Sequence, residues 1–313
     1  MNLLANVIQV LILVLAAPLL RGFIARLKAI IQRRRGASIW RPYADLWKLF
    51  HKEDLVPKTA TAVFRGAPAI GFAVTLVATA FLPLLHSNAL VQLDGDIFLF
   101  VYLLVIVRFV MSLAALDGGS AFGGMGSSRE ALVATLAEAP LFLVLTAVAI
   151  LAKTSSLSQM AQWTTTQNFF DISTVHILAF AALVIVAIAE TGRIPVDNPT
   201  THLELTMIHE AMVLEYSGPS LALIEWSQAI KLHVMGALMV ALFAPWGMSA
   251  VDTAGGLLVA LGVYALKLLG LAIGLSIVES SVAKLRMYVV PDFLRVASAL
   301  AILAVIFTAI TKR

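Results

Sequence analysis

The chain has 313 residues, of which 60% are hydrophobic and only 13% are charged. Soluble domains carry about 25% charged residues, so this composition indicates a membrane protein and excludes a string of soluble domains. Cysteine is absent, which excludes disulfides and thiolate ligation of an iron–sulfur cluster or a nickel–iron centre by this chain. The electron carriers of any redox reaction that it serves must therefore belong to partners.

Eight apolar segments follow one another along the chain, each near the roughly 20 residues that a helix needs to cross a bilayer. The fifth of them is the shortest. They lie approximately at 3–24, 66–86, 97–116, 131–152, 173–189, 220–243, 255–278 and 293–311. We therefore expect an all-α, polytopic bundle of about eight transmembrane helices that forms a single domain over residues 1–313.

The basic residues of the connecting loops are unevenly distributed. Residues 21–65 alone hold eleven Lys and Arg, and one side of the predicted bundle holds 16 against three on the other. Because cytoplasmic loops carry the excess of Lys and Arg, we expect both termini outside and the loops at 21–65 and 189–219 in the cytoplasm. Within the first loop, the apolar side chains after Pro42 share one helical face, which predicts an amphipathic interfacial helix. The alternative is headgroup binding by the basic run 33–35 alone.

Residues 117–130, D-G-G-S-A-F-G-G-M-G-S-S-R-E, contain five glycines within ten positions. No G-K-[ST] ending and no preceding strand accompany them, so we exclude a nucleotide site. We expect a tightly turned loop, with Ser127 or Ser128 capping the next span and Glu130 in the first turn of that span.

The stretch 189–218 concentrates acidic side chains between two spans, where such groups usually serve charge movement or docking. Asn198 and Pro199 indicate the start of a helix that we expect to reach Tyr216. Three interpretations compete: a metal site, a solvated cytoplasmic helix, and a proton or coupling path. The metal site is disfavoured, because His202 and His209 are seven residues apart and do not form H-E-x-x-H with Glu204 and Glu210.

Six further ionisable residues fall inside or near the predicted spans. Unpaired charges at that depth cost several kcal/mol, so these side chains should face the bundle interior, paired or hydrated. They are Arg108, Glu138, Glu225, Lys231, Lys267 and Glu279.

The run A-E-T-G-R-I-P-V-D-N-P and the ending L-E-Y-S-G resemble the signature loop of the NADH dehydrogenase subunit 1 family, a membrane component of respiratory complex I. The first loop is similar too, and the order and number of spans agree, so the resemblance covers essentially the whole chain. Two departures from the complex I pattern indicate a different branch of the family. Residues 36–40 stand where the complex I protein has G-P-N-x-V-G, and Thr200 and His202 stand where it has two further acids. The glycine-rich stretch and E-T-G-R-I-P-V-D-N-P-T-T-H-L-E-L are closer to the membrane subunit of energy-converting (group 4) nickel–iron hydrogenases, the formate hydrogenlyase subunit 4 and hydrogenase-4 component C group.

The resemblance implies a non-catalytic subunit of the bacterial or archaeal cytoplasmic membrane, with no bound metal or cofactor and no nucleic-acid partner. It would anchor cytoplasmic hydrogenase-like large and small subunits, which carry the nickel–iron centre and the iron–sulfur clusters. It would join them to antiporter-like membrane subunits and couple electron transfer to proton or sodium movement.

We assign residues from the resemblance, which carries most weight at Glu190, Asp197, Glu204 and Glu215, and from the local pattern, which alone places Glu210. Proton handling is expected at Glu138, Glu190, Asp197, Glu204, Glu210 and Glu215, with Lys231, Lys267 and Glu279 as central links. Partner docking is expected at Arg33, Arg35, Asp45, Trp47 and Arg193, and Arg193 can instead pair with an acid.

Two alternatives stay open. The chain could be the quinone-binding member of this family in complex I, with quinone entering near Arg35, Asp45 and Trp47, although the two departures weigh against this. It could also be a stand-alone transporter, but the two halves contain no convincing repeat.

Overall fold

The computed structural model describes residues 2–167, 174–197, 207–248 and 254–311. Over these ranges the chain is helical and contains no strand. Seven described helices are long and apolar enough to cross a membrane, and α7 (Thr174–Glu190) is an eighth, shorter apolar helix. The chain is therefore an all-α, multi-pass membrane protein, as its hydropathy predicts, and the fifth span is the short one.

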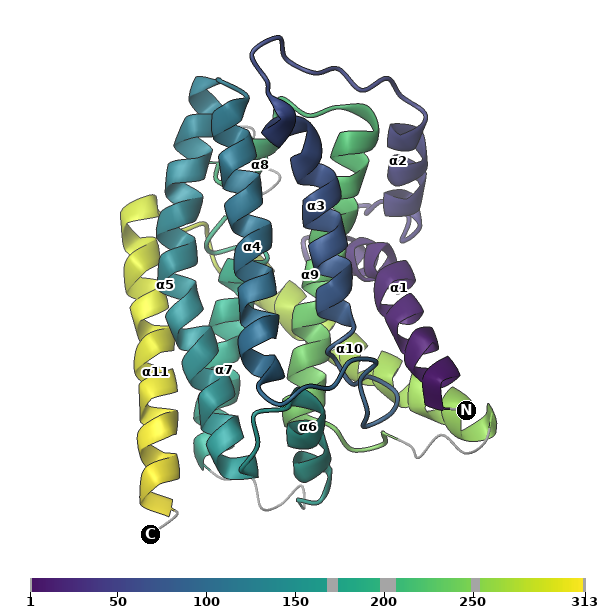
Figure 1. Ribbon diagram of the computed structural model, residues 1–313, viewed down its shortest axis with the longest axis vertical. Helices are drawn as coiled ribbons and strands as arrows, with labels where there is room; N and C mark the ends of the chain where they lie inside the picture. The colour runs from purple at the N-terminus through teal and green to yellow at the C-terminus, as the bar shows by residue number, and fades with distance from the viewer. Residues whose placement is uncertain (1, 168–173, 198–206, 249–253, 312–313) are drawn as a thin grey trace.

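The long helices stand side by side over most of the bundle, and α10 crosses them obliquely to reach α1 (Figure 1). Three short helices connect them, α2 (Arg41–Phe50), α6 (Leu157–Thr165) and α8 (His209–Val213). The long helices are α1 (Asn2–Ile31), α3 (Ala62–Thr79), α4 (Asp96–Asp117), α5 (Ala121–Ala152), α9 (Gly218–Phe243), α10 (Ala254–Ser281) and α11 (Val290–Thr311).

Helices α2 and α8 lie at the same end of the bundle, whereas α1 begins and α11 ends towards the opposite end (Figure 1). The basic first loop and the acidic loop therefore share one end, which agrees with the pattern of Lys and Arg. The compartment that this end faces stays a prediction, as do the external termini.

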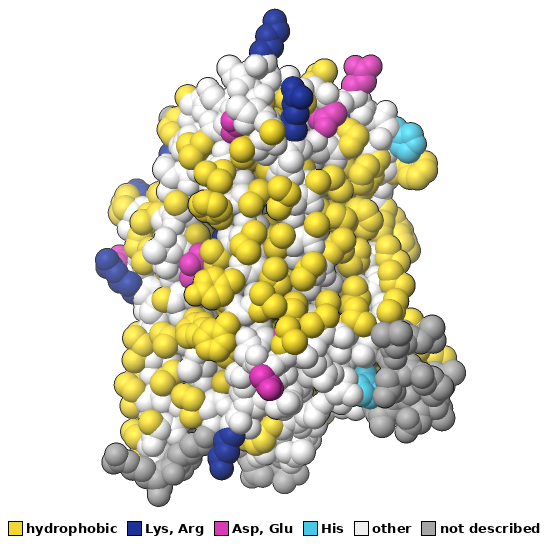
Figure 2. Space-filling model, in the orientation of Figure 1, with side chains coloured by type: hydrophobic (Ala, Val, Ile, Leu, Met, Phe, Trp, Pro, Cys, Tyr) yellow, Lys and Arg dark blue, Asp and Glu magenta, His cyan; other side chains and the backbone are white. Residues whose placement is uncertain are grey.

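Apolar side chains fill the interior and cover the outside. Phe100, Leu145, Leu183 and Leu238 are fully buried in the main core between α4, α5, α7 and α9. Figure 2 shows apolar side chains spread across the face formed by α3, α4 and α5. An outer surface of this kind is suited to lipid or to neighbouring membrane subunits, because neither supplies hydrogen bonds to polar groups.

The predicted amphipathic helix is present as α2, which contains no buried residue. Its apolar side nevertheless touches the bundle. The Tyr43 hydroxyl donates to the Leu15 carbonyl of α1, and the Phe50 ring meets Trp226 of α9 edge-on at 6.4 Å. The Trp47 side of α2 faces outward, with 71% of that residue exposed.

The prediction for the glycine-rich stretch is wrong over most of its length, because α5 begins at Ala121 and its first turns contain three of the five glycines, whereas Gly118 and Gly119 form the turn before it. The side chain of Ser120 caps the helix by accepting from the Gly123 N–H at 3.1 Å. A Cβ on Gly123 would lie 2.5 Å from the Ala115 carbonyl oxygen, and one on Gly126 would lie 3.0 Å from atoms of α8 and the residue before it. The glycines therefore bring neighbouring backbones close together. Ser127 instead donates to the Ser112 carbonyl.

The prediction of one helix to Tyr216 is also wrong in its described part. Helix α8 spans only His209–Val213, and Met207 and Ile208 precede it outside any helix. Asp197, on the preceding turn, accepts from the backbone N–H groups of Ile208 and His209 at 3.2 and 3.1 Å. A side chain distant in sequence thus satisfies donors at the start of α8 that a continuous helix would satisfy internally. Asn198 and Pro199, the predicted start, lie outside the described residues.

Candidate functional site

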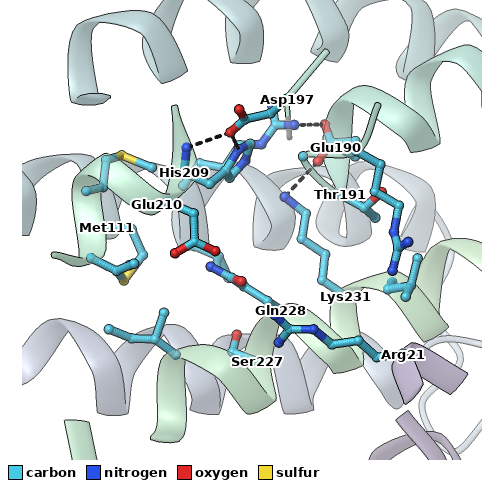
Figure 3. A pocket seen from close by; sticks show the side chains of 18 of the residues that line it. Arg21, Met111, Glu190, Thr191, Asp197, His209, Glu210, Ser227, Gln228 and Lys231 are labelled. Atoms are coloured by element: carbon cyan, nitrogen blue, oxygen red, sulfur yellow. Dashed lines mark hydrogen bonds and ion pairs between the residues drawn. The ribbon is translucent and has the colours of Figure 1, made fainter. Parts of the chain in front are cut away.

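A cavity of about 370 Å³ lies between α1, α3, α4, α5, α9 and the segments 190–197 and 209–213 (Figure 3). One wall is apolar and includes Phe72, Val107, Met111 and Met212. Ionisable side chains from several helices also line the cavity. Such charges at membrane depth are costly unless they are paired or hydrated, so their pairing decides what the cavity can do.

Glu190, the last residue of α7, is held between two cations. Arg108 Nη2 of α4 lies 2.5 Å from its Oε1, and Lys231 Nζ of α9 lies 2.9 Å from its Oε2. Glu190 is 2% exposed and Arg108 is 6% exposed. Burial of these three charges is tolerable only because each faces an opposite charge.

Glu130 of α5 continues the network on the other side of Arg108. Its Oε1 lies 3.4 Å from Arg108 Nε, and its Oε2 lies 3.2 Å from His209 Nε2 of α8. Glu130 is 1% exposed. Because α5 already begins at Ala121, Glu130 lies more than two turns inside this helix, and its carboxylate reaches both partners there.

Asp197 completes the network at the turn after α7. Its Oδ2 lies 3.4 Å from His209 Nδ1, and its Oδ1 accepts from Lys284 Nζ at 2.9 Å. Burial by itself would raise the pKa of Asp197. The hydrogen bonds and charges of His209 and Lys284 outweigh burial and lower this pKa far below its ordinary value.

These contacts form one continuous series of alternating charge, which we call the charge chain. It joins α9 to the segment after α10 by way of α7, α4, α5 and α8. In order, it consists of Lys231, Glu190, Arg108, Glu130, His209, Asp197 and Lys284. A change of charge at one member acts directly on the next, because the separations are short and the surroundings exclude most solvent.

Two separate pairings flank the charge chain. Glu279 of α10 binds Arg193 at 2.8 Å through Oε1 and Lys28 at 3.1 Å through Oε2. Arg21 of α1 pairs with Glu225 of α9. Arg193 therefore pairs with an acid, as one of its two expected roles requires.

The charge chain leaves room for water. The Arg108 Nη1 atom is buried and has no hydrogen-bonding partner among the described residues, although guanidinium groups carry five donors. At about 30 Å³ per molecule, the cavity could hold on the order of ten waters. A hydrated cavity beside paired charges provides both proton-exchanging groups and a medium for proton transfer.

Glu210 differs from the acids of the charge chain. In Figure 3 its carboxylate points into the space between Met111 and Gln228, and it makes no ion pair with any described residue. Burial, reinforced by the nearby charge of Glu225, raises the pKa of Glu210 above its ordinary value, and Arg21 opposes the shift only partly. This carboxyl is therefore suited to taking up a proton.

Other predicted proton-handling residues lie apart from the cavity. Glu138 is half-buried on α5, with no ion pair or hydrogen bond to the part of the chain that the structure describes. Glu215 is exposed beyond α8. The Lys267 ammonium donates to the Ala244 and Trp246 carbonyls at the end of α9, and Glu204 lies outside the described residues.

The predicted docking residues of the first loop are on the surface. Arg33 and Arg35 are exposed, and Asp45 binds Arg41 at 3.0 Å along α2. The rings of Trp47 and His51 are in tilted contact, with centroids 4.4 Å apart, and Trp47 remains largely exposed. The structure thus brings Glu190, Asp197, Glu210, Lys231 and Glu279 to one cavity and leaves the first-loop residues outside it.

Sequence reasoning missed four members of the charge chain as site residues. Arg108 carried a signal, since it is a basic residue inside a span. Glu130 was expected in a first helical turn, His209 was considered only as a metal ligand, and Lys284 was counted only for membrane sidedness. Their contacts join residues as far apart as 87 positions in sequence, so local patterns could not reveal them.

The signature ending Y-S-G has a structural role. Tyr216 stacks on Phe64 at 4.0 Å and donates to the Phe64 carbonyl, while Ser217 accepts from the Leu55 N–H at 2.7 Å. Gly218 has φ +49°, and a Cβ there would lie 2.5 Å from the Glu53 carbonyl oxygen. Through these contacts, residues 216–218 at the end of the acidic stretch pack against residues 53–64 at the end of the first loop.

A family model described as NADH dehydrogenase matches residues 4–309. The chain belongs to this family. It is 33% identical over 299 residues to hydrogenase-4 component C of Escherichia coli, covering 96% of this chain and 93% of that protein. It is 32% identical over 295 residues to formate hydrogenlyase subunit 4 of the same organism, covering 93% and 94%.

More distant relatives agree. NADH-ubiquinone oxidoreductase chain 1 of Triticum aestivum is 31% identical over 248 residues, covering 74% of this chain and 74% of that protein. A chain of the membrane-bound sulfane sulfur reductase, an archaeal respiratory membrane complex, has a TM-score of 0.82 at 22% identity, covering 98% of this chain and 100% of that one. The last similarity shows a shared fold. The resemblance read from the motifs is thus confirmed at the level of the family.

Proposed function

We propose that this chain is the membrane subunit of a complex of the hydrogenase-4 and formate hydrogenlyase type. Two relatives named as parts of such complexes match it over more than nine tenths of its length. In this role it anchors a cytoplasmic redox arm in a bacterial or archaeal cytoplasmic membrane and couples electron transfer to proton or sodium translocation. It contributes no cysteine-ligated iron–sulfur or nickel–iron centre, because it has no cysteine.

The partners follow from this role. Hydrogenase-like large and small subunits carry the nickel–iron centre and iron–sulfur clusters, and antiporter-like membrane subunits adjoin the bundle. The exposed first-loop residues Arg33, Arg35, Asp45 and Trp47 form the docking surface for the soluble arm. Helix α2, which carries Asp45 and Trp47, lies at the same end of the bundle as α8 (Figure 1), so an arm docked on α2 would sit at the end that bears His209.

The observation that carries the coupling role is the charge chain beside a cavity large enough for water. In our proposal, a redox event in the docked arm changes the charge near Asp197. Alternating contacts pass that change to Glu190 and Lys231 inside the membrane. Glu210 takes up and releases the proton that moves through the cavity, and Glu138, Glu204, Glu215, Lys267 and Glu279 extend the path towards its two ends.

The partner assignment is tested by purifying the complex through an affinity tag on this chain. A hydrogenase-like large subunit with paired C-x-x-C motifs, and nickel in the purified complex, are expected. A complex without such a subunit contradicts the assignment.

The coupling assignment is tested in the intact complex with Glu204→Gln and, as a matched surface control, Asp292→Asn, whose carboxylate is exposed on α11 and pairs with Arg295. Hydrogen evolution or ion translocation should fall in the first variant and remain in the second. Unchanged hydrogen evolution and translocation in Glu204→Gln contradict its role.

A second candidate function is quinone binding, as expected of the complex I branch of the family. The observation that favours it is the cavity lining, which combines the apolar side chains of Phe72, Met111 and Met212 with polar groups, as pockets for small molecules usually do. Quinone reductase activity that quinone-site inhibitors block would favour this function over the first.

A further inference from the structure

His209 sits between two carboxylates in a way that makes its contacts depend on its proton count. Nε2 faces Glu130 of α5 at 3.2 Å, and Nδ1 faces Asp197 of the preceding turn at 3.4 Å. A neutral imidazole has one N–H donor and one acceptor nitrogen, whereas the imidazolium has two donors. Both contacts are therefore attractive only when the ring carries two protons, and a neutral ring sets a lone pair against a carboxylate oxygen.

The two carboxylates depend on His209 to different degrees. Asp197 also accepts from two backbone N–H groups and from Lys284 Nζ. Glu130 is otherwise approached only by Arg108 among the described residues, at the longer distance of 3.4 Å. A ring that gives up one proton therefore keeps Nε2–H on Glu130 and loses the proton at Nδ1.

The surroundings of the ring are tightly built. A Cβ on Gly192 would lie 2.6 Å from His209 Nδ1, and Gly192 has φ +58°. Glycine at this position thus permits both the turn and the approach of the ring edge. Several elements contribute charged groups near the ring. They are Glu130, Asp197, Glu190, Lys231 and Glu210, with Arg108 of α4 behind Glu130 and Lys284 behind Asp197.

We propose that His209 is a proton-operated latch that joins and separates the inner and outer parts of the charge chain. With two protons the ring connects Glu130, Arg108, Glu190 and Lys231 to Asp197 and Lys284. When Nδ1 releases its proton to cavity water, the ring becomes neutral, the contact with Asp197 is lost, and Nε2–H stays on Glu130. The latch rests on the proposed function, because it gives the coupling path a definite point of interruption.

The direct test is ¹⁵N nuclear magnetic resonance of the ring in the full chain within its complex, labelled at histidine and held in lipid nanodiscs. His209 is one of six histidines, and its signals are assigned by their loss in His209→Gln. The midpoint of the titration between the doubly protonated and the neutral ring should lie above pH 6.5, the ordinary midpoint for histidine. At higher pH the neutral ring should be the Nε2–H tautomer, which ¹⁵N shifts distinguish from the Nδ1–H tautomer.

Two variants make the test specific. Glu130→Gln removes one carboxylate and should lower the midpoint by about one pH unit, a tenfold loss of proton affinity. Asp197→Asn serves the same purpose if Glu130→Gln fails to assemble. Asp292→Asn, on the exposed part of α11, should leave the midpoint unchanged.

A ring that is neutral below pH 6.5, that becomes the Nδ1–H tautomer, or whose midpoint ignores both carboxylate variants overturns the latch. This readout does not require hydrogen evolution or ion translocation. If the coupling test fails but His209 titrates as predicted, the proposed function is removed, and the proton-dependent contact between His209 and Asp197 still stands. The reverse result would remove the latch alone.

Discussion

The charge chain and helix α2 both contain ion pairs, but the paired side chains differ in burial. Within the charge chain, Glu190, Arg108 and Glu130 are almost fully buried, and each faces an opposite charge. On α2, Arg41 and Asp45 also form an ion pair, but both are exposed. Breaking the buried contacts leaves an uncompensated charge in a poorly solvated place, whereas water replaces the exposed contact. Burial therefore separates residues on which the fold and coupling depend from residues available to partners.

The largest effect is expected for Glu190→Gln. The substitution removes the anion between Arg108 and Lys231, which leaves buried Lys231 without its carboxylate partner and Arg108 with Glu130 alone. Breaking a buried pair typically costs about 3–5 kcal/mol. Thermal and denaturant unfolding in nanodiscs should show this loss, and Asp292→Asn should change stability by no more than about 1 kcal/mol. Similar stability in the two variants would remove the distinction between buried and exposed charges.

The next effect concerns pH. Burial alone would lower the pKa of His209, but the carboxylates of Glu130 and Asp197 outweigh it and raise the pKa above its ordinary value. The native state therefore holds this proton more tightly than the unfolded chain does. The resulting stability is complete below about pH 6.5 and is lost as pH rises through the folded pKa. Unfolding free energies should fall by up to about 1.4 kcal/mol per pH unit in that interval, and the fall should be reduced in His209→Gln. An identical slope in both proteins would contradict this.

Glu210 and Glu215 offer a sharper comparison, because they are five residues apart and only one faces the cavity. Burial raises the pKa of Glu210 above its ordinary value, so Glu210→Gln should remove the carboxyl group that exchanges protons with the cavity. We expect a severalfold loss of ion translocation for Glu210→Gln and a smaller one for the exposed Glu215→Gln. Translocation measured in proteoliposomes tests this order, and the reverse order would place the proton path outside the cavity.

The smallest effect on stability is expected for Trp47→Ala. Its side chain is largely exposed, and such substitutions usually change stability by about 0.5 kcal/mol or less. If α2 forms the docking surface, the same variant should reduce the amount of the soluble subunits that copurifies with the chain. Unfolding and copurification, measured on one preparation, separate the two roles. If the soluble subunits copurify with Trp47→Ala in undiminished amount, Trp47 is not part of the docking surface.

The sequence alone determined the membrane class, the number of apolar spans, the amphipathic helix after Pro42 and the family. Each of these depends on residues close together in the chain, through hydropathy, helical periodicity or a contiguous motif. The same local reasoning failed at residues 117–130, where glycines that permit close packing between helices have the composition of a turn. It failed again before His209, where the Asp197 carboxylate accepts the backbone hydrogen bond that a carbonyl of a longer helix would have accepted.

Only the tertiary structure decided which ionisable residues act together. Glu190, Glu210 and Glu215 belong to one acidic stretch, yet one is paired, one points into a cavity and one is exposed. Arg108, Glu130, His209 and Lys284 come from four elements and meet because helix packing brings them within ion-pairing distance. Pairing in a membrane protein depends on distance and burial across the bundle, and neither quantity is encoded in the spacing of residues along the chain.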